Sequence, residues 1–385
     1  MRVLVVSARF PEPGGKGDQS RAFSFITHLA PTHEVDVLSA ARGSSAEAEA
    51  ALRAVARVEI ATRGPVRRGM ASLWDLGRLR PAQVGWMMPG GTWRRARELA
   101  RDADVVLVNT ARSLRGPLPA PLVLDHVDAL SLNLRRRASG PEGPPRRAAA
   151  RVEAALMRRW ERRAAGWCAA QVVSAADDAA SLPAQPPCHV IPVGWDGASV
   201  PDDTGARDLD VVLSGNMGYP PNRDAAEWFA AAVLPAIRRL RPGTGALVVG
   251  RDASSLRLSG VEVASDVPDL LAYLRRAKVA IVPLRIGTGT PYKVLEAAAS
   301  GAAVVATPWA AERFGLPAAG SGADELARRT VELLEDAGLR AEQVRGGYAV
   351  AARHRGDELA KRLERVLEDA ARRRPQAIGG ALQLG

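Results

Sequence analysis

Cysteine, aromatic residues and long apolar runs are scarce in this sequence of 385 residues, and each scarcity excludes a class of protein. Two cysteines, Cys168 and Cys188, are too few for a disulfide framework or a metal cluster, so we expect both to be reduced and structural. No apolar run reaches the roughly 18 residues of a membrane span. The opening Met-Arg-Val-Leu-Val-Val is typical of a β-strand and lacks the cleavage site of a signal peptide. We therefore expect a soluble, cytoplasmic protein.

Positive charge is abundant, because 53 lysines and arginines outnumber 42 aspartates and glutamates to give a net charge of +11. This balance favours an anionic partner such as a nucleotide or a phospholipid surface. Between Arg135 and Arg163, ten arginines accompany three glutamates. That region is either the solvated face of a helix or a contact with an acidic acceptor or with the inner face of an anionic membrane. We do not expect nucleic acid as a partner, because aromatic residues make up only 4% and no zinc-ligand spacing is present.

Short runs rich in β-branched residues alternate with helix-favouring stretches in both halves of the chain. This alternation predicts the α/β class, with two Rossmann-like domains whose parallel sheets face a central cleft. We place the domains at residues 1–195 and 196–345. A helical stretch over 344–373 is predicted to pack back toward the first domain, mainly through residues 346–373, and residues 374–385 are predicted to be a disordered tail.

The most informative segment, residues 281–306, has the pattern strand, glycine turn, helix, strand. Gly287 and Gly289 permit a sharp turn and leave room for a large group close to the backbone. Thr290 can cap the following helix, and Pro291 fits its first position. The N–H groups and the dipole at such a helix start favour an anion, for example a diphosphate. The same pattern also occurs for packing alone, so the residues by themselves leave both interpretations open.

Two side chains near the start of this helix suit a nucleotide. Lys293 lies in the first turn and adds a full positive charge, and it is one of only four lysines in the chain. Glu296 follows one turn later. Its carboxylate can accept hydrogen bonds from two vicinal hydroxyls, such as those of a ribose.

This segment resembles the donor-binding region of family 4 glycosyltransferases, which are retaining enzymes of the GT-B fold. Leu295-Glu296-Ala297 matches the second of two glutamates in that family, so the resemblance implies that Glu296 holds the donor ribose. Thr288 stands where the family has its first glutamate. Residues 287–293 are similar to the Gly-Thr-Gly-Thr-x-x-Lys donor loop of a subset of these enzymes. The resemblance therefore implies donor contacts by Gly287, Thr288, Gly289, Thr290 and Lys293, with Lys293 also stabilising the leaving group.

Other segments are similar to the same family in the expected order along the chain. Residues 190–196 resemble its interdomain motif, residues 10–21 its first glycine loop, and residues 214–222 a Gly-x-Met-x-Tyr-x-Pro-Asn segment of the subset. The arginine and lysine that usually follow this last strand are not clearly present. The resemblance implies further donor-binding residues in these loops: Gly15, Gly17, Gly215, Asn216 and, as a substitute for the missing pair, Arg223. In the first glycine loop we expect Lys16 or Arg21 to assist electrostatically.

Residues 124–131 contain the candidate catalytic groups on the acceptor side. A strand predicted to end at Asp125 leaves His126 and Asp128 at the carboxyl edge of the sheet. Family members commonly have a histidine here that contacts the donor sugar. In the subset the pattern is closer to Asp-x-Val-Asp-Ala-x-Ser, which favours Asp128 as the group that orients the acceptor hydroxyl or accepts its proton. A structural histidine and a helix cap are the alternatives, and the choice between the two residues stays open.

The resemblance implies a glycosyltransferase that moves a sugar from a nucleotide-diphosphate-sugar to a hydroxyl of a polysaccharide or glycolipid intermediate or of a secondary metabolite. The first domain would bind the acceptor and the second the donor, with retention and without a cofactor or metal, since the sequence has no paired-aspartate motif. Three alternatives remain open: another nucleotide-sugar enzyme such as an epimerase, a catalytically silent GT-B binding protein, and a basic nucleic-acid-binding protein.

Overall fold

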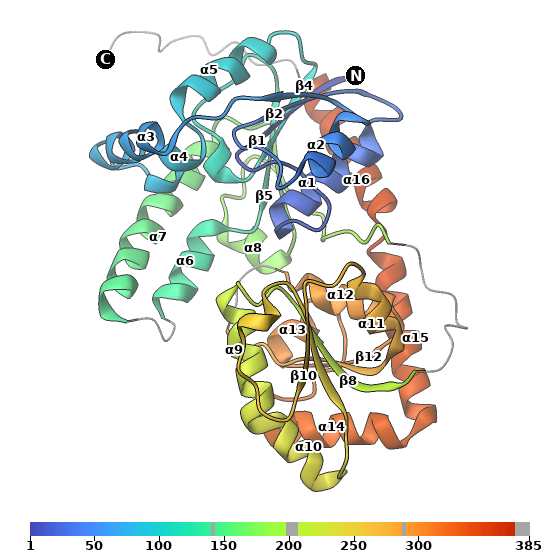
Figure 1. Cartoon of the computed structure of the whole chain (residues 1–385). Coiled ribbons are helices and arrows are strands. Elements are labelled where there is room, and N and C mark those ends of the chain that lie inside the picture. The colour runs from blue at the N-terminus through green and yellow to red at the C-terminus, as the bar shows by residue number, and fades with distance from the viewer. Residues whose placement is uncertain (140–142, 198–206, 287–289, 374–385) are drawn as a thin grey trace. The chain divides into compact units, whose positions relative to one another are not determined.

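The computed structural model describes residues 1–139, 143–197, 207–286 and 290–373. The chain divides into two compact units (Figure 1). The first contains Met1–Gly194 together with the chain from Gly356 onward, and the second contains Trp195–Arg355. The tail predicted at 374–385 lies outside the described residues.

The first unit is built on a seven-stranded parallel sheet with the order β3-β2-β1-β4-β5-β6-β7. Residues of β1 alternate between the two faces, as expected for a strand with covered faces. Val3 and Val5 pack with one hydrophobic cluster, and Leu4 and Val6 pack with another. The strands are β1 Arg2–Ser7, β2 Glu34–Ser39, β3 Arg57–Ile60, β4 Val105–Asn109, β5 Leu122–Val127, β6 Ala170–Val173 and β7 Cys188–Val190.

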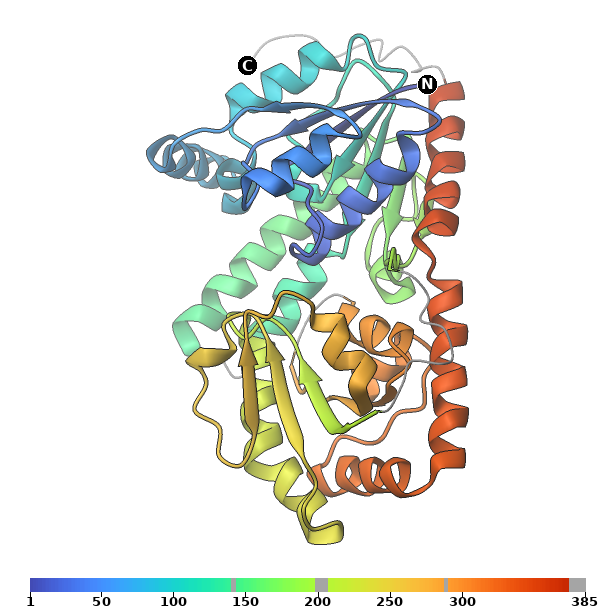
Figure 2. The same ribbon diagram turned by 45° about the vertical axis from the view of Figure 1, so that its right-hand side comes forward.

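Helices cover both faces of this sheet. They are α1 Gly17–Leu29, α2 Ala46–Arg53, α3 Pro65–Gly77, α4 Ala82–Met87, α5 Gly90–Leu99, the short 3-10 helix η1 Ala111–Ser113, α6 Leu130–Ala138, α7 Pro144–Ala165, α8 Ala176–Ser181 and α16 Gly356–Arg372. The last of these comes from the far end of the chain and lies beside α1, where the red and blue helices run next to each other in Figure 2. Its Leu359, Leu363 and Leu367 are buried in the same cluster as Val3 and Val5.

The second unit has a five-stranded parallel sheet with the order β10-β9-β8-β11-β12. Its core joins Val211 and Leu213 of β8 to Phe229 and Ile281. The strands are β8 Leu209–Ser214, β9 Ala246–Gly250, β10 Glu262–Ser265, β11 Ala277–Val282 and β12 Ala303–Ala306. The helical elements are α9 Pro220–Trp228, η2 Phe229–Val233, α10 Leu234–Leu240, η3 Ala253–Ser255, α11 Leu270–Arg276, α12 Tyr292–Ala299, α13 Pro308–Glu312, α14 Ala323–Glu335 and α15 Ala337–Arg353.

The single helical stretch predicted over 344–373 is instead two helices that belong to different units. The α15 helix ends at Arg353 in the second unit, and α16 begins at Gly356 in the first. The backbone between the two helices is not helical. There His354 O accepts a hydrogen bond from Trp195 N at 2.6 Å. The backbone of Gly356 also lies very close to Gly194, because a Cβ at position 194 would be 2.9 Å from Gly356 Cα. Residues 346–353 therefore pack with the second unit.

None of the helices in the described part of the chain combines the length and the apolar character that a bilayer crossing requires.

Candidate functional site

The strand order of the second unit identifies where a ligand should bind. The chain runs from β8 outward to β9 and β10, then crosses to the other side of β8 to form β11 and β12. At such a switch point the loops after two adjacent parallel strands diverge, and open α/β sheets bind ligands in the crevice at those carboxyl ends. The loop after β8 begins at Gly215, and the segment after β11 leads into α12. The two loops singled out from the sequence thus leave adjacent strands at the switch point.

Lys293 connects these two loops. Its Nζ donates a hydrogen bond to Oδ1 of Asn222, at 2.7 Å, in the helix that follows the β8 loop. Asn222 Nδ2 in turn donates to the carbonyl of Asn216 at 2.8 Å, and Asn216 Oδ1 accepts from Gly218 N at 2.9 Å. A polar chain therefore runs from α12 into the loop, although Lys293 and Asn222 are 71 positions apart in sequence.

Lys293 and Glu296 influence each other's ionisation at this site. Burial lowers the pKa of Lys293 to about 8, an effect that the negative charge of Glu296 opposes. Burial raises the pKa of Glu296, and the positive charge of Lys293 opposes that shift. Each charged form is therefore poorly solvated in the unliganded protein. An anion near Lys293 would favour its charged form, so the site is suited to a negatively charged ligand.

Gly215 is required at this site by the position of Lys293. A Cβ on Gly215 would lie 2.7 Å from Lys293 Nζ and 3.0 Å from Asn222 Nδ2. The first distance is shorter than real Cβ contacts and the second is tighter than most of them, so a larger residue would displace the ammonium group or the amide. The role of a glycine here is to let a positive charge approach the end of β8.

Substituting Gly215 with alanine should therefore weaken nucleotide binding about 10-fold, because the ammonium group of Lys293 is displaced by a few tenths of an ångström. We expect a loss of stability of about 1–3 kcal/mol from the overpacking. The matched control is Gly245→Ala, since a Cβ there meets no atom within 4 Å. Isothermal titration with a nucleoside diphosphate measures the difference. Equal affinity for the two variants would show that the position of Lys293 does not matter for the ligand.

The start of α12 differs from the prediction by one residue. Thr290 was expected to cap the helix and Pro291 to open it, but Tyr292 is the first helical residue and Pro291 precedes it without a side-chain cap. Pro291 has ψ of 84°, which lies outside the helical range, so the helix begins one residue later than predicted. Gly287, Thr288 and Gly289 lie outside the described residues.

Tyr292 brings an aromatic pair to the beginning of α12. Its ring centroid lies 6.2 Å from that of Trp195, in a tilted arrangement. Burial, together with the charges of Glu296 and Asp196, raises the pKa of Tyr292 above its ordinary value. Within the described residues the indole Nε1 of Trp195 is buried without a hydrogen-bond partner. Trp195 had been considered only as part of an interdomain motif, and the sequence carried no signal that it would lie beside Tyr292.

Arg223, predicted as a substitute for the family's diphosphate-binding pair, contacts a different element. It lies on α9 and its Nη2 donates to Oγ of Ser255, at 2.8 Å, in η3. The neighbouring Asp224 is paired with Arg285, the residue three positions after β11. The guanidinium of Arg285 also lies 5.0 Å from the centroid of the Trp228 ring. The described contacts of Arg223 therefore do not join it to the Lys293 network.

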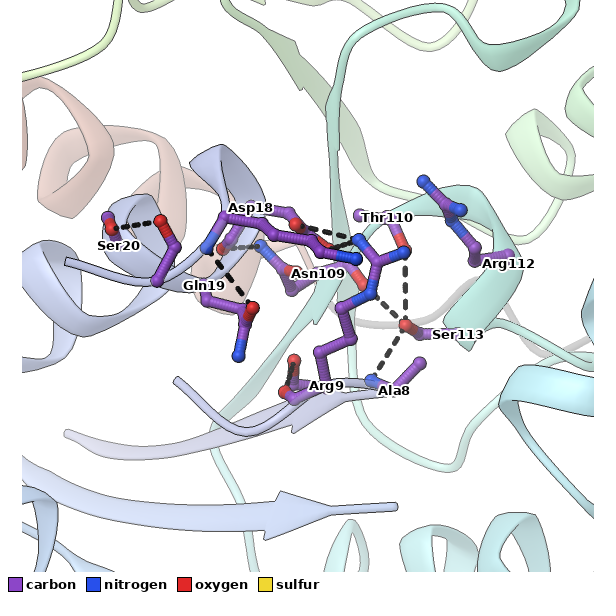
Figure 3. A network of polar contacts seen from close by, with 12 residues as sticks. Ala8, Arg9, Asp18, Gln19, Ser20, Asn109, Thr110, Arg112 and Ser113 are labelled. Carbon is purple, nitrogen blue, oxygen red and sulfur yellow. Dashed lines mark hydrogen bonds and ion pairs between the residues drawn. The ribbon is translucent and has the colours of Figure 1, made fainter. Parts of the chain in front are cut away.

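The first unit has its own switch point, between β1 and β4, and a polar network surrounds it (Figure 3). Arg9, just after β1, donates from Nη1 to both carboxylate oxygens of Asp18 at 2.9 Å. Asn109, at the end of β4, donates to the carbonyl of Asp18 at 3.4 Å. Ser113 Oγ accepts from the backbone N–H of Ala8 at 3.0 Å and so links the two strand ends. The sequence reasoning missed Arg9 and Asp18, although a charged residue directly after a buried strand is the signal that would have found Arg9.

Arg112 adds a second guanidinium to this region. Burial is the main cause that lowers its pKa, and the positive charge of Arg9 adds to the effect, whereas Asp18 and Asp128 oppose it. Within the part of the chain that the structure describes, its Nε has no hydrogen-bond partner. Thr110, two residues earlier, adopts a left-handed conformation with φ of 69°. A strained non-glycine residue beside incompletely satisfied charge is typical of functional regions.

The first glycine loop differs in detail from the expectation. The left-handed residue is Gly14, with φ of 65°, and a Cβ on Gly15 would lie 3.0 Å from Glu12 Cγ and Gln19 Cβ. Gly17 begins α1, and a side chain there would meet no atom within 4 Å. Packing within the loop therefore requires glycine at position 15 but not at position 17.

Arg21, considered as an electrostatic aid for the donor, is part of the core of the first unit. Its Nε donates to Oδ2 of Asp125 at 2.8 Å, and the two side chains are 2% and 1% exposed. Nη1 donates to the carbonyl of Pro192 at 2.8 Å. The guanidinium is buried and bonded to both of these partners, so we assign Arg21 a structural role, although among the described residues its Nη2 has no hydrogen-bond partner.

The strand that contains His126 is longer than predicted. β5 continues to Val127, so His126 is a strand residue with a fully buried side chain rather than an edge residue. Its Nε2 lies 3.1 Å from Oε1 of Gln171, and burial lowers its pKa to about 4, so it is neutral near pH 7. His126 therefore fits the alternative of a hydrogen-bonded structural histidine and does not lie at the carboxyl edge, because β5 continues to pair with β6 through Val127.

Asp128 is the first residue beyond β5 and lies at the carboxyl edge of the sheet. The turn before it places Val127 in a left-handed conformation, with φ of 65°, which is strained for a β-branched residue. Oδ1 of Asp128 accepts a hydrogen bond from Ser174 Oγ at 3.2 Å, just after β6. Its charge also acts on Arg112. The structure thus places Asp128, Arg112 and Arg9 in the segments after the adjacent strands β5, β4 and β1, with Asp18 in the first turn of α1.

The fold is that of GT-B glycosyltransferases, as comparison with solved structures shows. Anabaena HepE in complex with UDP aligns with a TM-score of 0.65 at 16% identity, over 96% of this chain and 100% of that one, and the complex with UDP-glucose gives the same values. WaaG, a glycosyltransferase involved in lipopolysaccharide biosynthesis, aligns with a TM-score of 0.63 at 14% identity, over 95% of this chain and 99% of that one.

The second unit also matches a family at the level of sequence. Residues 208–336 match the model of the family described as glycosyl transferases group 1. The match begins beside β8 and ends after α14, so it contains both loops at the switch point. No curated protein sequence matches the chain significantly.

Proposed function

We propose that this protein is a glycosyltransferase that transfers a sugar from a nucleotide-diphosphate-sugar to an acceptor hydroxyl. The observation that carries the proposal is the position of Lys293, whose ammonium is held against Gly215 at the β8/β11 switch point. The family match over residues 208–336 and the structural similarity to HepE, which was solved with UDP and with UDP-glucose, support the same reading.

We assign the donor to the second unit. The diphosphate would accept hydrogen bonds from the amides at the start of α12, and Lys293 would neutralise part of its charge. Glu296, one turn further along the same helix, would accept hydrogen bonds from the ribose hydroxyls. Because the pKa of Glu296 is raised by burial, the positive charge of Lys293 also helps to keep its carboxylate ionised.

We propose that the leaving diphosphate is stabilised in the transition state by Lys293 and these amides, without a metal ion. Each group is positioned before the reaction and needs no reorganisation when charge develops on the leaving oxygen. Transfer with retention at the sugar carbon is our expectation from the resemblance of residues 287–293 to the donor loop of a retaining family. The first residues of that loop lie outside the described chain, so their contacts belong to the proposal alone.

We assign the acceptor to the first unit, with Asp128 as the group that orients the acceptor hydroxyl or accepts its proton. Asp128 lies at the carboxyl edge of the sheet beside Ser174, whereas the buried His126 is poorly placed for either task. A polysaccharide or glycolipid intermediate and a secondary metabolite are both compatible with this assignment.

A thermal-shift screen against nucleoside diphosphates tests the proposal first, because a ligand that binds only the folded chain raises its melting temperature. We expect at least one nucleoside diphosphate to produce a shift and its sugar conjugate to serve as donor, with activity unchanged in EDTA. Asp128→Asn should keep the shift and lower turnover about 100-fold or more. Conversion of the nucleotide-sugar without release of nucleoside diphosphate would indicate an epimerase and contradict the proposal.

A further inference from the structure

Helix α3 of the first unit turns its apolar face to the solvent. Val66, Met70, Leu73 and Trp74 have exposed fractions of 73%, 66%, 70% and 60%. Their spacing of four, three and one residues places them on one side of the helix. The opposite side contains the fully buried Asp75 and packs on α4. Surface helices normally have the reverse arrangement, so this face requires a partner.

The exposed apolar side chains continue to the end of the helix and beyond it. Leu76, Leu79 and Trp86 are 40%, 62% and 46% exposed, whereas in most of the described chain large apolar side chains are buried. We call the set of Val66, Met70, Leu73, Trp74, Leu79 and Trp86 the α3 face.

Within residues 62–97, which contain the α3 face, the exposed charges are all positive. Between residues 62 and 97 the only acidic residue is Asp75, which is buried and paired with Arg115 at 2.9 Å. Arg63, Arg67 and Arg78 are exposed in the same stretch. The guanidinium of Arg78 lies 3.6 Å from the centroid of the Trp74 ring, so a positive charge is held directly beside an exposed aromatic side chain.

The neighbouring helix α7 adds more positive charge. Val84 of α4 shares a hydrophobic cluster with Met157 and Trp160 of α7, so the two helices are packed together. The outer positions of α7 are occupied by exposed arginines: Arg146, Arg151, Arg158, Arg159, Arg162 and Arg163. This is the arginine-rich region that the sequence had already suggested as a surface for an anionic partner.

From these observations we infer that the α3 face docks on a lipid bilayer with anionic headgroups. A bilayer accepts apolar side chains and aromatic rings at its interface while its headgroups attract the surrounding arginines. A second copy of the chain is a poorer partner, because pairing two α3 faces would bring Arg67 and Arg78 of both copies together without an exposed carboxylate nearby. This inference does not depend on the proposed transferase activity.

Co-sedimentation of the full chain with vesicles tests it. We expect binding to vesicles made of equal parts phosphatidylglycerol and phosphatidylcholine, and much weaker binding to phosphatidylcholine alone. The double variant Leu73→Ser/Trp74→Ser should weaken the partition coefficient more than about tenfold, since apolar area no longer enters the interface. Arg67→Glu should weaken binding as well, and added salt should weaken binding of the native chain.

Matched controls separate docking from misfolding and from general stickiness. Leu240→Ser changes a residue that is 52% exposed on α10 of the second unit, and Arg365→Glu reverses an exposed charge on α16. Both should bind vesicles like the native chain, and every variant should keep its melting temperature because the residues are exposed. Equal binding of the double variant and the native chain would overturn the inference. A dimer of the free chain that Leu73→Ser dissociates would also overturn it, because the face would then be a self-association surface.

Discussion

Replacing Lys293 by methionine should lower turnover about 100- to 1,000-fold, because one preorganised positive group opposite the leaving diphosphate is lost. The native ammonium is hydrogen-bonded to Asn222 at 2.7 Å, and burial lowers its pKa to about 8. A group held in this way adds its full charge when the leaving oxygen becomes negative. Steady-state kinetics with the donor identified by thermal shift measures the effect.

The pH dependence of binding gives this prediction a second readout. In the unliganded chain the fraction of charged Lys293 falls as pH rises through about 8, and a bound diphosphate should raise that pKa. Nucleoside diphosphate affinity of the native chain should therefore decrease above pH 8, whereas Lys293→Met should remove the decrease. Affinity that is independent of pH in both proteins would contradict the assigned contact.

The Lys293→Met substitution should change the stability of the fold in the opposite direction to its effect on activity. The folded pKa of Lys293 lies below its ordinary value, so the buried ammonium disfavours folding at pH values below about 8, and this effect disappears as pH rises toward the unfolded pKa. Lys293→Met should consequently melt at the same or a higher temperature than the native chain at neutral pH. Lys361→Met, at an exposed position on α16, is the matched control and should leave turnover, affinity and melting temperature unchanged.

Replacing Glu296 by alanine should weaken nucleoside diphosphate binding about 100-fold or more, with the fold intact. A carboxylate that accepts two hydrogen bonds contributes about 1.5–3 kcal/mol for each bond. Burial already raises the pKa of Glu296 in the free protein, because the carboxylate is desolvated before the ligand binds. Little of the interaction energy is therefore spent on removing water from this carboxylate. Isothermal titration measures the loss.

The ribose assignment can be isolated with a nucleotide that lacks the hydroxyls. A 2′,3′-dideoxynucleoside diphosphate should bind the native chain weakly, and Glu296→Ala should weaken its binding no further. Glu227→Ala, at an exposed position of α9 in the same unit, is the control and should behave like the native chain with both ligands. If the dideoxynucleotide and its parent lose affinity equally in Glu296→Ala, the carboxylate binds something other than the ribose.

Local patterns predicted the secondary structure around the site well. Buried β-branched runs predicted β8 and β11, and the spacing of Lys293 and Glu296 placed both one turn apart on the same helix. These predictions succeed because strand alternation and helix periodicity depend on residues within one or two turns. The start of α12 was missed by one position, because Pro291 has ψ of 84°, outside the helical range, and precedes the helix instead of opening it.

Predictions that depended on partners distant in sequence were less reliable. Arg21 looked like a loop cation, yet Asp125, a hundred and four positions away, holds it in the core. His126 looked like an edge residue, yet pairing of β5 with β6 extends the strand beyond it. The sequence pattern predicted one continuous helical stretch after residue 344. The structure instead divides this stretch between the two units, next to the place where Trp195 N donates a hydrogen bond to His354 O.

The sequence by itself determined the α/β class, the parallel strands, and the short helix that bears Lys293 and Glu296, because neighbouring residues suffice to specify each of these. Only the tertiary structure decided that Lys293 meets Asn222 above Gly215, that Arg9 and Arg112 lie near each other, and that the apolar side of α3 faces outward. Such contacts follow from the order of strands within a sheet and from which helix covers which face, and that order is selected by packing of the whole unit.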